Sequence, residues 1–354
     1  MKAIVTTAWV AGMWVLAMAA TPALAGGDTP SFSLAWSEYP SWSAFGVAHE
    51  FKIINGKKGE LGNIEKKWGV DIVLKQADYD PCLVMYGAGQ TDAVCITNMD
   101  VLNPSLSRPS VAILPTSTSH GADACIVTKD ITDVKQLKGR KVYGLAQTVS
   151  EYCFVRNLEE LGEKPADYTF VNMDPGAAAV AMQQKQKGFD AIVVWNPFVL
   201  ETLNRRKDTR VLFDSTSIPG EIIDMVVVSQ DVLDKPGGEA FACAVIDAFY
   251  ELNKLLADKD TRDEALIALG EKFSNLDLQS MRKVVQQTKF YDTPKKGSEL
   301  FKSKKLHKIT QKVVAFCSDN KIVPKKPKVG FGDKKDKNVN LRFDPSYIQK
   351  VREK

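Results

Sequence analysis

The chain has 354 residues, with 47 Lys and Arg against 43 Asp and Glu, and its formal net charge is +4. Its length allows two compact lobes of ordinary size. The basic excess lies in residues 321–354, which carry a net charge of +7 and leave −3 for the rest of the chain. Because this stretch is Lys-rich and broken by Pro and Gly, it lacks the compact Arg and aromatic pattern of a nucleic-acid-binding face. Binding to nucleic acid is therefore not expected.

The first 25 residues have the pattern of an export signal. Lys2 precedes an apolar run over 4–20, and the small residues Ala23 and Ala25 stand at the positions that a signal peptidase requires. The apolar run is shorter than the roughly 20 residues that span a bilayer. We therefore expect residues 1–25 to be a cleaved signal peptide and the mature protein to be periplasmic.

Strand-like and helix-like segments alternate through the first two-thirds of the mature chain, which predicts parallel strands joined by crossover helices. The first unit is expected to contain strands at 32–36, 71–75, 93–97 and 111–114, with helices at 42–51, 61–68 and 81–86. The second unit is expected to contain strands at 124–128, 142–145, 168–171, 191–195, 211–214 and 222–228, with helices at 133–137, 150–161, 176–187 and after Pro197. Beyond Ser229 the pattern is helical, over 238–257, 261–273, 278–287 and 298–316.

Two α/β units followed by a helical segment that returns to the first unit predict a two-lobed clamp. We expect one lobe to contain 30–116 and 225–320, and the other to contain 117–224, with two segments of the chain crossing between the lobes. Residues 321–354 are expected to form a basic, extended tail along the surface. The apolar residues of 341–348 predict that the end of this tail docks on the protein.

The chain has six cysteines, which an oxidising compartment would allow to pair in 15 ways that the sequence cannot rank. They are Cys82, Cys95, Cys125, Cys153, Cys243 and Cys317. Most lie within strand-like or helix-like apolar segments. We therefore expect buried thiols with at most one or two disulfides.

Four segments resemble the nitrate/sulfonate/taurine class of ABC-importer binding proteins. They are Gly-Ala-Gly-Gln-Thr-Asp-Ala-Val at 87–94, Leu-Lys-Gly-Arg-Lys-Val at 137–142, Asp-Pro-Gly-Ala-Ala-Ala at 174–179, and 189–197, which ends in Trp-Asn-Pro. The likeness extends from about residue 32 to about residue 228. Within this class, Thr-Asn-Met-Asp at 97–100, Val-Ser-Glu-Tyr at 149–152 and Trp-Asn-Pro at 195–197 are most similar to the subgroup associated with urea carboxylase, whose members are thought to import urea or guanidine.

This resemblance implies a type II periplasmic-binding-protein fold: two mostly parallel sheets flanked by helices, with a hinge of two crossing segments. It also implies a monomer that captures a small solute and delivers it to a permease and ATPase complex in the inner membrane. The Lys- and Gly-rich segment 53–60 and the long basic tail depart from the pattern of the class, and they leave the exact ligand open.

Ligands of open α/β sheets bind beyond the carboxyl ends of the strands. Polar and aromatic residues gather at such positions in this sequence, and they could supply the aromatic wall and the polar groups that a solute site needs. Core packing is the competing interpretation for Trp42, and helix capping is the competing one for Asp100, Ser150 and Glu151. The expected ligand-binding residues are Trp36, Glu38, Tyr39, Trp42, Tyr79, Asn98, Asp100, Ser150, Glu151, Asp174, Trp195 and Asn196.

The acidic residues at these positions favour a cationic or hydrogen-bond-donating ligand, because no Arg or Lys accompanies them to hold an anion. Guanidine, urea or an amine fits this pattern. The alternatives are an anion (taurine, an alkanesulfonate or nitrate) in the same clamp, or a ligand-binding module that serves a sensor.

An enzyme is not expected, and neither is a cofactor or a metal. The chain has only three His residues and lacks a Cys-x-x-Cys, a His-x-x-x-His or a Gly-x-Ser-x-Gly motif. A pyrimidine-synthesising enzyme of thiamine biosynthesis uses a related fold. The Cys-rich motif associated with that enzyme is missing here.

Overall fold

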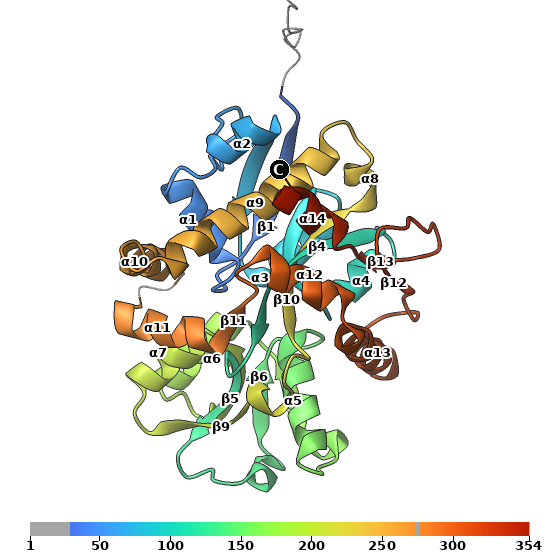
Figure 1. Ribbon diagram of the computed structural model, residues 1–354. Coiled ribbons are helices and arrows are strands. Elements are labelled where there is room, and N and C mark those ends of the chain that lie inside the picture. Colours follow the sequence, from blue (N-terminus) through green and yellow to red (C-terminus); the bar gives the residue numbers. More distant parts are fainter. Residues whose placement is uncertain (1–28, 274–275, 354) are drawn as a thin grey trace, which may run out of the picture.

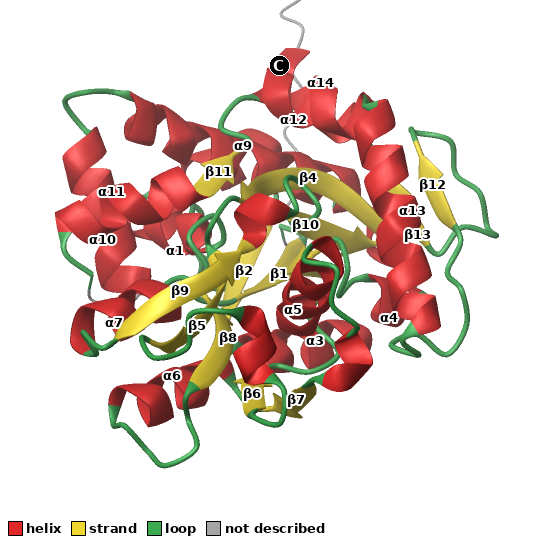
Figure 2. Cartoon of the chain, turned by 90° about the horizontal axis from the view of Figure 1, so that it is seen from below, coloured by secondary structure: helices red, strands yellow, loops and turns green. Residues whose placement is uncertain are grey.

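The computed structural model describes residues 29–273 and 276–353, so the expected signal peptide lies outside the described residues. Figure 1 shows two lobes, one above the other, each built around its own sheet. Helices cover both sheets (Figure 2). This is the α/β, two-sheet architecture that the sequence predicts.

The larger sheet has eight described strands in the order β12-β13-β4-β10-β3-β1-β2, with β11 beside β4. Their bounds are β1 (Ser31–Trp36), β2 (Asp71–Gln76), β3 (Ala93–Thr97), β4 (Ser110–Ser119), β10 (Ile223–Ser229), β11 (Thr288–Phe290), β12 (Val329–Phe331) and β13 (Leu341–Phe343). The smaller sheet has the order β7-β6-β8-β5-β9. Its strands are β5 (Asp123–Thr128), β6 (Lys141–Gly144), β7 (Thr169–Asn172), β8 (Ala191–Trp195) and β9 (Thr209–Asp214).

Most helices follow the expected segments, but α4, α8, α14, η2 and η3 were not expected, and the expected helix 298–316 is two helices. In the first two-thirds of the chain they are α1 (Ser43–Glu50), α2 (Asn63–Trp68), α3 (Tyr79–Gly87), α4 (Leu102–Ser105), η1 (Val134–Leu137), α5 (Val149–Glu160), η2 (Pro165–Asp167), α6 (Pro175–Gln183), α7 (Phe198–Arg205) and η3 (Ser215–Ser217). The later ones are α8 (Gln230–Leu233), α9 (Gly238–Ala257), α10 (Arg262–Phe273), α11 (Leu278–Gln287), α12 (Pro294–Lys302), α13 (Lys304–Asp319) and α14 (Ser346–Glu353). No helix among these described residues is both long and apolar enough to cross a membrane.

Two segments of the chain connect the lobes. The chain passes from β4 into β5 through 120–122, and it returns from β9 into β10 through 215–222. Because β10 enters the larger sheet from the other lobe, it runs antiparallel to both of its neighbours, β3 and β4. Each sheet is therefore mixed, with parallel pairs such as β1–β2 and β6–β7 beside antiparallel ones. This arrangement places the ends of several strands along the line where the lobes meet.

The larger lobe is held together by apolar strands and by the long helix α9. All five residues of β3 are buried, so the apolar run of this strand reflects burial on both faces of the sheet. Phe241 of α9 stacks on Phe32 of β1 with ring centroids 5.0 Å apart. A methyl group added at Gly46 of α1 would lie 2.8 Å from the Trp36 ring, so only glycine allows this helix to pack so closely on β1.

The end of the chain is packed on the larger sheet, as the apolar residues of 341–348 indicate. β13 pairs in parallel with β4, and Leu341 and Phe343 are fully buried. β12 adds one further strand, and α14 packs on α9.

All six cysteines are buried, and burial raises the pKa of the Cys82 thiol to about 12. The thiols of Cys82, Cys95, Cys125, Cys153 and Cys317 are not joined in disulfides. The expectation of buried thiols therefore agrees with the structure for these residues.

Candidate ligand-binding site

A small cavity lies between the lobes, at the ends of several elements. Its described lining residues are Tyr39, Trp42, Tyr79, Thr97, Asp123, Val149, Trp195, Ile222 and Asp224. The volume that the centre of a water molecule can reach is about 10 Å³, which is close to the minimum for a single water molecule. The lobes are therefore closed around this space.

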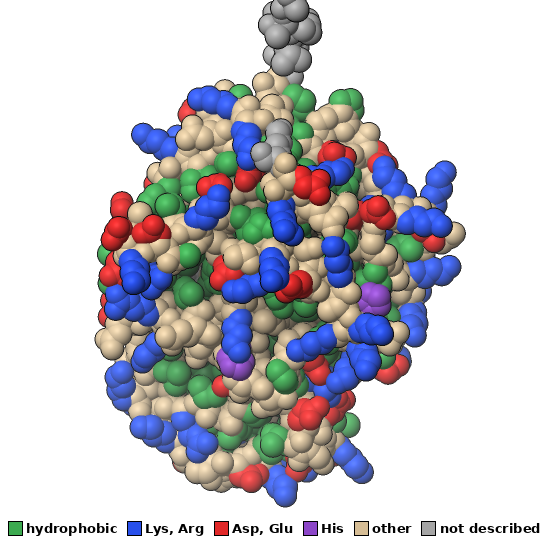
Figure 3. All heavy atoms as spheres, viewed as in Figure 1, with side chains coloured by type: hydrophobic (Ala, Val, Ile, Leu, Met, Phe, Trp, Pro, Cys, Tyr) green, Lys and Arg blue, Asp and Glu red, His purple; other side chains and the backbone are tan. Residues whose placement is uncertain are grey.

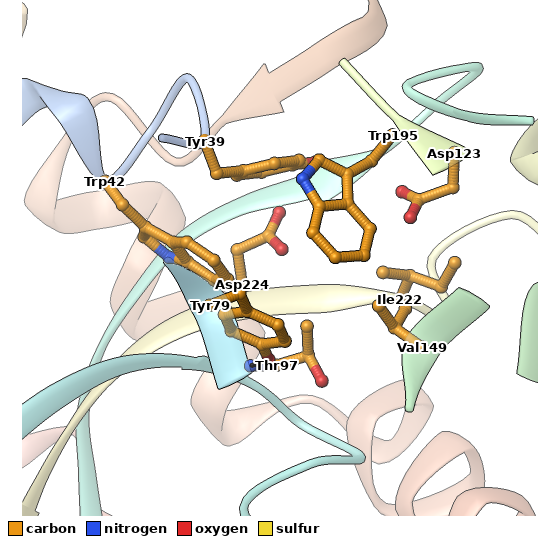
Figure 4. A pocket seen from close by; sticks show the side chains of 9 residues that line it. All are labelled: Tyr39, Trp42, Tyr79, Thr97, Asp123, Val149, Trp195, Ile222 and Asp224. Atoms are coloured by element: carbon orange, nitrogen blue, oxygen red, sulfur yellow. Dashed lines mark hydrogen bonds between the residues drawn. The ribbon is translucent and has the colours of Figure 1, made fainter. Parts of the chain in front are cut away.

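Four aromatic rings form the walls of the cavity (Figure 4). Tyr39 and Trp42 follow β1, Tyr79 begins α3, and Trp195 ends β8 in the other lobe. The Trp42 ring stacks on Tyr79 with centroids 5.3 Å apart, and Tyr39 lies 4.9 Å from Trp42. Tyr79 meets Trp195 edge to face at 5.6 Å. This last contact joins the two lobes at the site.

Two carboxylates, Asp123 and Asp224, reach the same space. Asp224 is the second residue of β10 and accepts a hydrogen bond of 2.5 Å from the Ser117 hydroxyl. Among the described residues, Oδ2 of Asp123 has no hydrogen-bond partner although Asp123 is only 3% exposed. Burial raises the pKa of Asp123 to about 7 and the pKa of Asp224 well above its usual range. None of the nine described lining residues is basic, so neither charge is neutralised from within the cavity wall.

A third carboxylate, Asp100, lies directly beside the cavity and contacts two of its lining residues. It accepts hydrogen bonds from the Tyr79 hydroxyl at 2.7 Å and the Thr97 hydroxyl at 2.8 Å. Burial raises the pKa of Asp100 to about 6, although the hydrogen bonds from Tyr79 and Thr97 and the nearby backbone N–H of Val149 act to lower it. Val149 begins α5 in the other lobe. The first turn of this helix therefore faces a carboxylate that belongs to the protein.

An outer acidic hollow of about 250 Å³ adjoins the cavity and shares Tyr79 and Trp195 with it. Its described acidic residues are Glu38, Asp78, Asp80 and Asp174. Burial raises the pKa of Glu38 to about 7, and the negative charges of Asp78 and Asp174 raise it further. A molecule that enters the cavity by this side passes four carboxyl groups.

Glu221 lies beside the hinge, not in the cavity. It accepts hydrogen bonds from Tyr152 at 2.7 Å and from Arg156 at 2.9 Å, both of which lie on α5, and from Lys312 of α13 at 3.2 Å. Burial would raise the pKa of Glu221, but the bonds from Arg156 and Tyr152 hold it below its usual value. This cluster ties the returning segment to helices on both sides of the hinge.

The structure brings some of the expected site residues together around the cavity. Tyr39, Trp42, Tyr79 and Trp195 line it, and Asp100 contacts Tyr79. Ser150 is buried one residue after Val149, and its hydroxyl has no partner among the described residues.

Glu38 and Asp174 lie in the outer acidic hollow and do not line the cavity itself. Asp174 also caps α6, since its side chain accepts a hydrogen bond of 2.9 Å from the Ala177 N–H.

Four expected site residues have other surroundings. Trp36 packs against Gly46 in the core of the larger lobe. The Asn98 side chain bonds to the backbone of Ile223 and of Glu221, and the Asn196 amide donates to Gln287. Glu151 accepts a hydrogen bond from the Gln147 N–H on the exposed side of α5. The amides of Asn98 and Asn196 hold elements together, and none of the four residues lines the cavity.

Five lining residues were not among those expected: Thr97, Asp123, Val149, Ile222 and Asp224. Asp224 could have been found, because a carboxylate inside the apolar strand 222–228 is costly unless it has a role. Asp123 gives a weaker signal, since it follows Gly121-Ala122 at the start of a strand. Val149 and Ile222 are ordinary apolar residues that no sequence pattern distinguishes.

Among the described residues, no group of three or more His, Cys, Asp or Glu side chains is arranged to hold a metal ion.

No known family model matches the chain. The chain is similar to a taurine-binding periplasmic protein of Escherichia coli, with 29% identity over 145 residues, which is 40% of this chain and 44% of that protein. The matched segment thus spans less than half of the curated relative.

Solved structures share the fold over most of the chain. The periplasmic aliphatic sulphonate binding protein from Escherichia coli is 19% identical, with a TM-score of 0.66 over 84% of this chain and 94% of that one. The alkanesulfonate-binding protein from Xanthomonas axonopodis pv. citri, bound to MOPS, has 15% identity and a TM-score of 0.67 over 85% and 96%. The periplasmic nitrate-binding protein from Synechocystis PCC 6803 has 14% identity and a TM-score of 0.54 over 73% and 70%. The chain therefore has the fold of periplasmic binding proteins.

Proposed function

We propose that this protein is the periplasmic solute-binding component of an ABC importer of the nitrate/sulfonate/taurine class, and that it captures a small nitrogen-rich cation such as guanidinium or an amine. The fold and the partial likeness to a taurine-binding protein support the binding role. A permease and ATPase complex in the inner membrane would be its partner, and the protein would act as a monomer. It would carry out no chemistry on the solute.

The observation that carries the choice of ligand is the pair of buried carboxylates in an aromatic cage. An anion placed there would meet Asp123 and Asp224 with no Arg or Lys among the nine described lining residues. A guanidinium ion would instead donate N–H groups to these carboxylates, and its flat face would stack on Trp42, Tyr79 or Trp195. Cation–π contacts of this kind gain strength when the site is dry.

The first turn of α5 supports the same choice. The exposed backbone N–H groups at a helix N-terminus favour negative charge. In a site for an anion, these N–H groups would be available to the ligand. Here the N–H of Val149 faces Asp100 closely enough to lower its pKa, so the protein's own carboxylate takes the position of an anion. The second candidate ligand remains an anion, because the matched proteins are named for taurine, sulphonates and nitrate.

Isothermal titration calorimetry separates the two candidates. The solutes are guanidinium, methylammonium, urea, taurine, ethanesulfonate and nitrate, compared at one ionic strength. We expect guanidinium or an amine to bind, and to bind more tightly at pH 8 than at pH 5, because the carboxyl groups whose pKa values lie near 6 and 7 are ionised only at the higher pH.

The variant D224N is expected to weaken cation binding by at least about tenfold, as the loss of one partner of a buried charge pair does. The matched control is E151Q, which removes a carboxylate on the exposed side of α5 and should leave the affinity unchanged. If a sulfonate or nitrate binds tightly to the wild type, and more tightly still to D224N, the proposal of a cationic ligand is contradicted and an anionic ligand is favoured.

A module that serves a sensor would need the same clamp. If genes for a permease and an ATPase lie beside the gene for this chain, transport is supported; a neighbouring membrane sensor gene would instead favour signalling. Conversion of any bound solute by the purified protein would show that an enzyme is the better description.

A further inference from the structure

The outer surface formed by residues 302–337 is strongly basic and is not explained by solute binding. This stretch has a net charge of +9 from twelve Lys and three Asp, and it contains no Arg. All twelve lysines are exposed. We call them the lysine face: Lys302, Lys304, Lys305, Lys308, Lys312, Lys321, Lys325, Lys326, Lys328, Lys334, Lys335 and Lys337.

The lysine face is one continuous region, although it comes from several elements. Figures 1 and 2 both place α13 beside β12 and its loops. His307 of α13 stacks on Phe331 of β12 with ring centroids 3.7 Å apart, which fixes the helix against the strand. Blue side chains accordingly gather along the right side of the molecule in Figure 3. A helix of 16 residues is about 24 Å long, so the charge is spread over a broad area.

Most of this charge is not neutralised by the protein. Within the described residues, Lys312 and Lys335 are the members of the lysine face that form ion pairs, with Glu221 and Asp234 respectively. Each unpaired lysine repels its neighbours, which costs some stability when the surface is free. A negatively charged partner surface would relieve this repulsion.

The chemistry of the lysine face fits a charged surface better than a folded partner. Protein interfaces are depleted in Lys and are centred on aromatic, Met or Arg anchors. Residues 302–337 contain no Trp, Tyr, Met or Arg. Their two Phe residues are packed inward, Phe316 on Tyr152 and Phe331 on Phe343, and the exposed large hydrophobic residues of the described chain lie elsewhere. Lys offers strongly hydrated point charges on flexible stems, which suit a smeared negative surface such as anionic lipid headgroups.

We propose that the lysine face binds the anionic phospholipid surface of a bilayer. The attraction is electrostatic and reversible, with no side chain inserted into the hydrocarbon. Each Lys near an anionic membrane strengthens binding by about fivefold. The full face therefore supplies enough attraction to hold the protein at a membrane at moderate salt. This proposal does not depend on which solute fills the cleft.

Sedimentation with sucrose-loaded vesicles tests the proposal, using phosphatidylcholine alone or phosphatidylcholine mixed with phosphatidylglycerol. The full chain is expected to sediment with the anionic vesicles and not with the neutral ones. Raising the salt from about 0.1 M to about 1 M shortens the screening length from about 10 Å to about 3 Å, and it should release the protein. Glycerol phosphate at the same ionic strength should not compete, because a surface and not a single headgroup is bound.

The test variant replaces Lys304, Lys305, Lys308, Lys325 and Lys326 with Gln, and it should bind anionic vesicles at least about tenfold more weakly. The control variant removes the same charge elsewhere, at exposed lysines outside the face: Lys57, Lys58, Lys66, Lys129 and Lys135. Both variants change only exposed side chains, and a thermal melt of each confirms that it is folded.

Three outcomes would overturn the proposal. The first is equal binding to neutral and anionic vesicles. The second is an equal loss of binding in the test and control variants, which would reflect net charge alone. The third is retention on DNA or on an acidic protein column at a salt concentration where no vesicle binding occurs.

Discussion

At the scale of single residues, the most informative side chains are the carboxylates that the fold keeps away from water. Burying an ionised group without a partner costs several kcal/mol, and a protein avoids this cost by keeping the group protonated or by pairing it with a cation. Asp123 and Asp224 are buried in a space without a basic side chain among its described walls. The folded chain without a solute therefore holds protons that a bound cation would displace.

The pH dependence of stability follows from Asp123. Its pKa is about 7 in the folded chain, against about 3.9 in an unfolded one. Between these values the folded state binds more protons than the unfolded state, so this group's contribution to the free energy of unfolding falls as the pH rises from about 4 to about 7. The variant D123N should remove this fall and raise the melting temperature at pH 8 by several degrees. Scanning calorimetry of both proteins at pH 5 and pH 8 measures the difference.

The control for this prediction is Asp319→Asn at the exposed end of α13. It should leave the difference between the melting temperatures at pH 5 and pH 8 unchanged, because this carboxyl group does not line the cavity. A melting temperature of D123N below that of the wild type at pH 8 would mean that the Asp123 carboxylate is stabilised by an interaction that the cavity walls do not reveal.

The residue scale is also where sequence reasoning reached its limit. The aromatic residues of the cavity were expected, because they follow strand ends that meet at one edge of a sheet. Asp224 was not, because the apolar residues around it predict a buried strand, although a carboxylate within such a strand is itself a signal of a role. Asn98 and Asn196 were expected at the ligand, but their amides complete backbone and side-chain hydrogen bonds between elements. A sequence does not reveal which partner a polar side chain will find.

At the scale of elements, the buried Glu65 side chain helps to hold the Lys- and Gly-rich segment 53–60 in place, together with Asp71, which accepts a hydrogen bond from the Gly59 N–H. Glu65 of α2 is fully buried, and its carboxylate accepts backbone hydrogen bonds from Asn55 at 2.5 Å, Gly62 at 2.6 Å and Ile72 at 2.8 Å. It thereby joins the loop, the start of α2 and β2. Burial raises the pKa of Glu65 despite these bonds.

Replacing Glu65 with Ala should destabilise the protein by about 3 kcal/mol or more, because three backbone N–H groups lose their acceptor in a buried setting. The matched control is E60A in the same segment, where the carboxylate is exposed and bonds to the Asn55 side chain. That change should cost no more than about 0.5 kcal/mol. Urea unfolding of the two variants gives both values, and equal costs would show that Glu65 does not organise this segment.

The elements themselves were largely predictable, because apolar periodicity and turn residues mark them in the sequence. The exceptions have physical reasons. The expected helix 298–316 is two helices, since Ser303 ends α12 and caps α13 by accepting a hydrogen bond from the N–H of Leu306. β11, β12 and β13 have three residues each, which is too short for an alternating pattern to appear. Their positions depend on pairing with β4 and with each other, which local sequence does not encode.

At the scale of the whole molecule, the two lobes must part for a solute to enter. Tyr39, Trp42 and Tyr79 are each 3% exposed and Trp195 is 4% exposed, and the space between their rings is close to the size of one water molecule. The ring contact that joins the lobes, Tyr79 with Trp195, lies at the site itself. Closure and solute binding therefore involve the same residues.

Small-angle X-ray scattering should show a smaller radius of gyration when a solute that binds is added, because the ligand favours the closed arrangement. The variant Y79A loses both the ring contact with Trp195 and the hydrogen bond to Asp100, so it should remain expanded at the same solute concentration. The control is V84A, an exposed side chain on the same helix, which should respond as the wild type does. An identical radius with and without bound solute in the wild type would contradict the clamp.

The buried thiols have a practical consequence for how this protein matures. At least five of its six cysteines are unpaired and buried inside the lobes. The native fold therefore needs no thiol oxidant and no disulfide isomerase to form. The same chain can acquire its tertiary structure in a reducing cytosol or in an oxidising compartment. A thiol-alkylating reagent would then label only molecules that have unfolded enough to expose these cysteines, so the extent of labelling would measure unfolding.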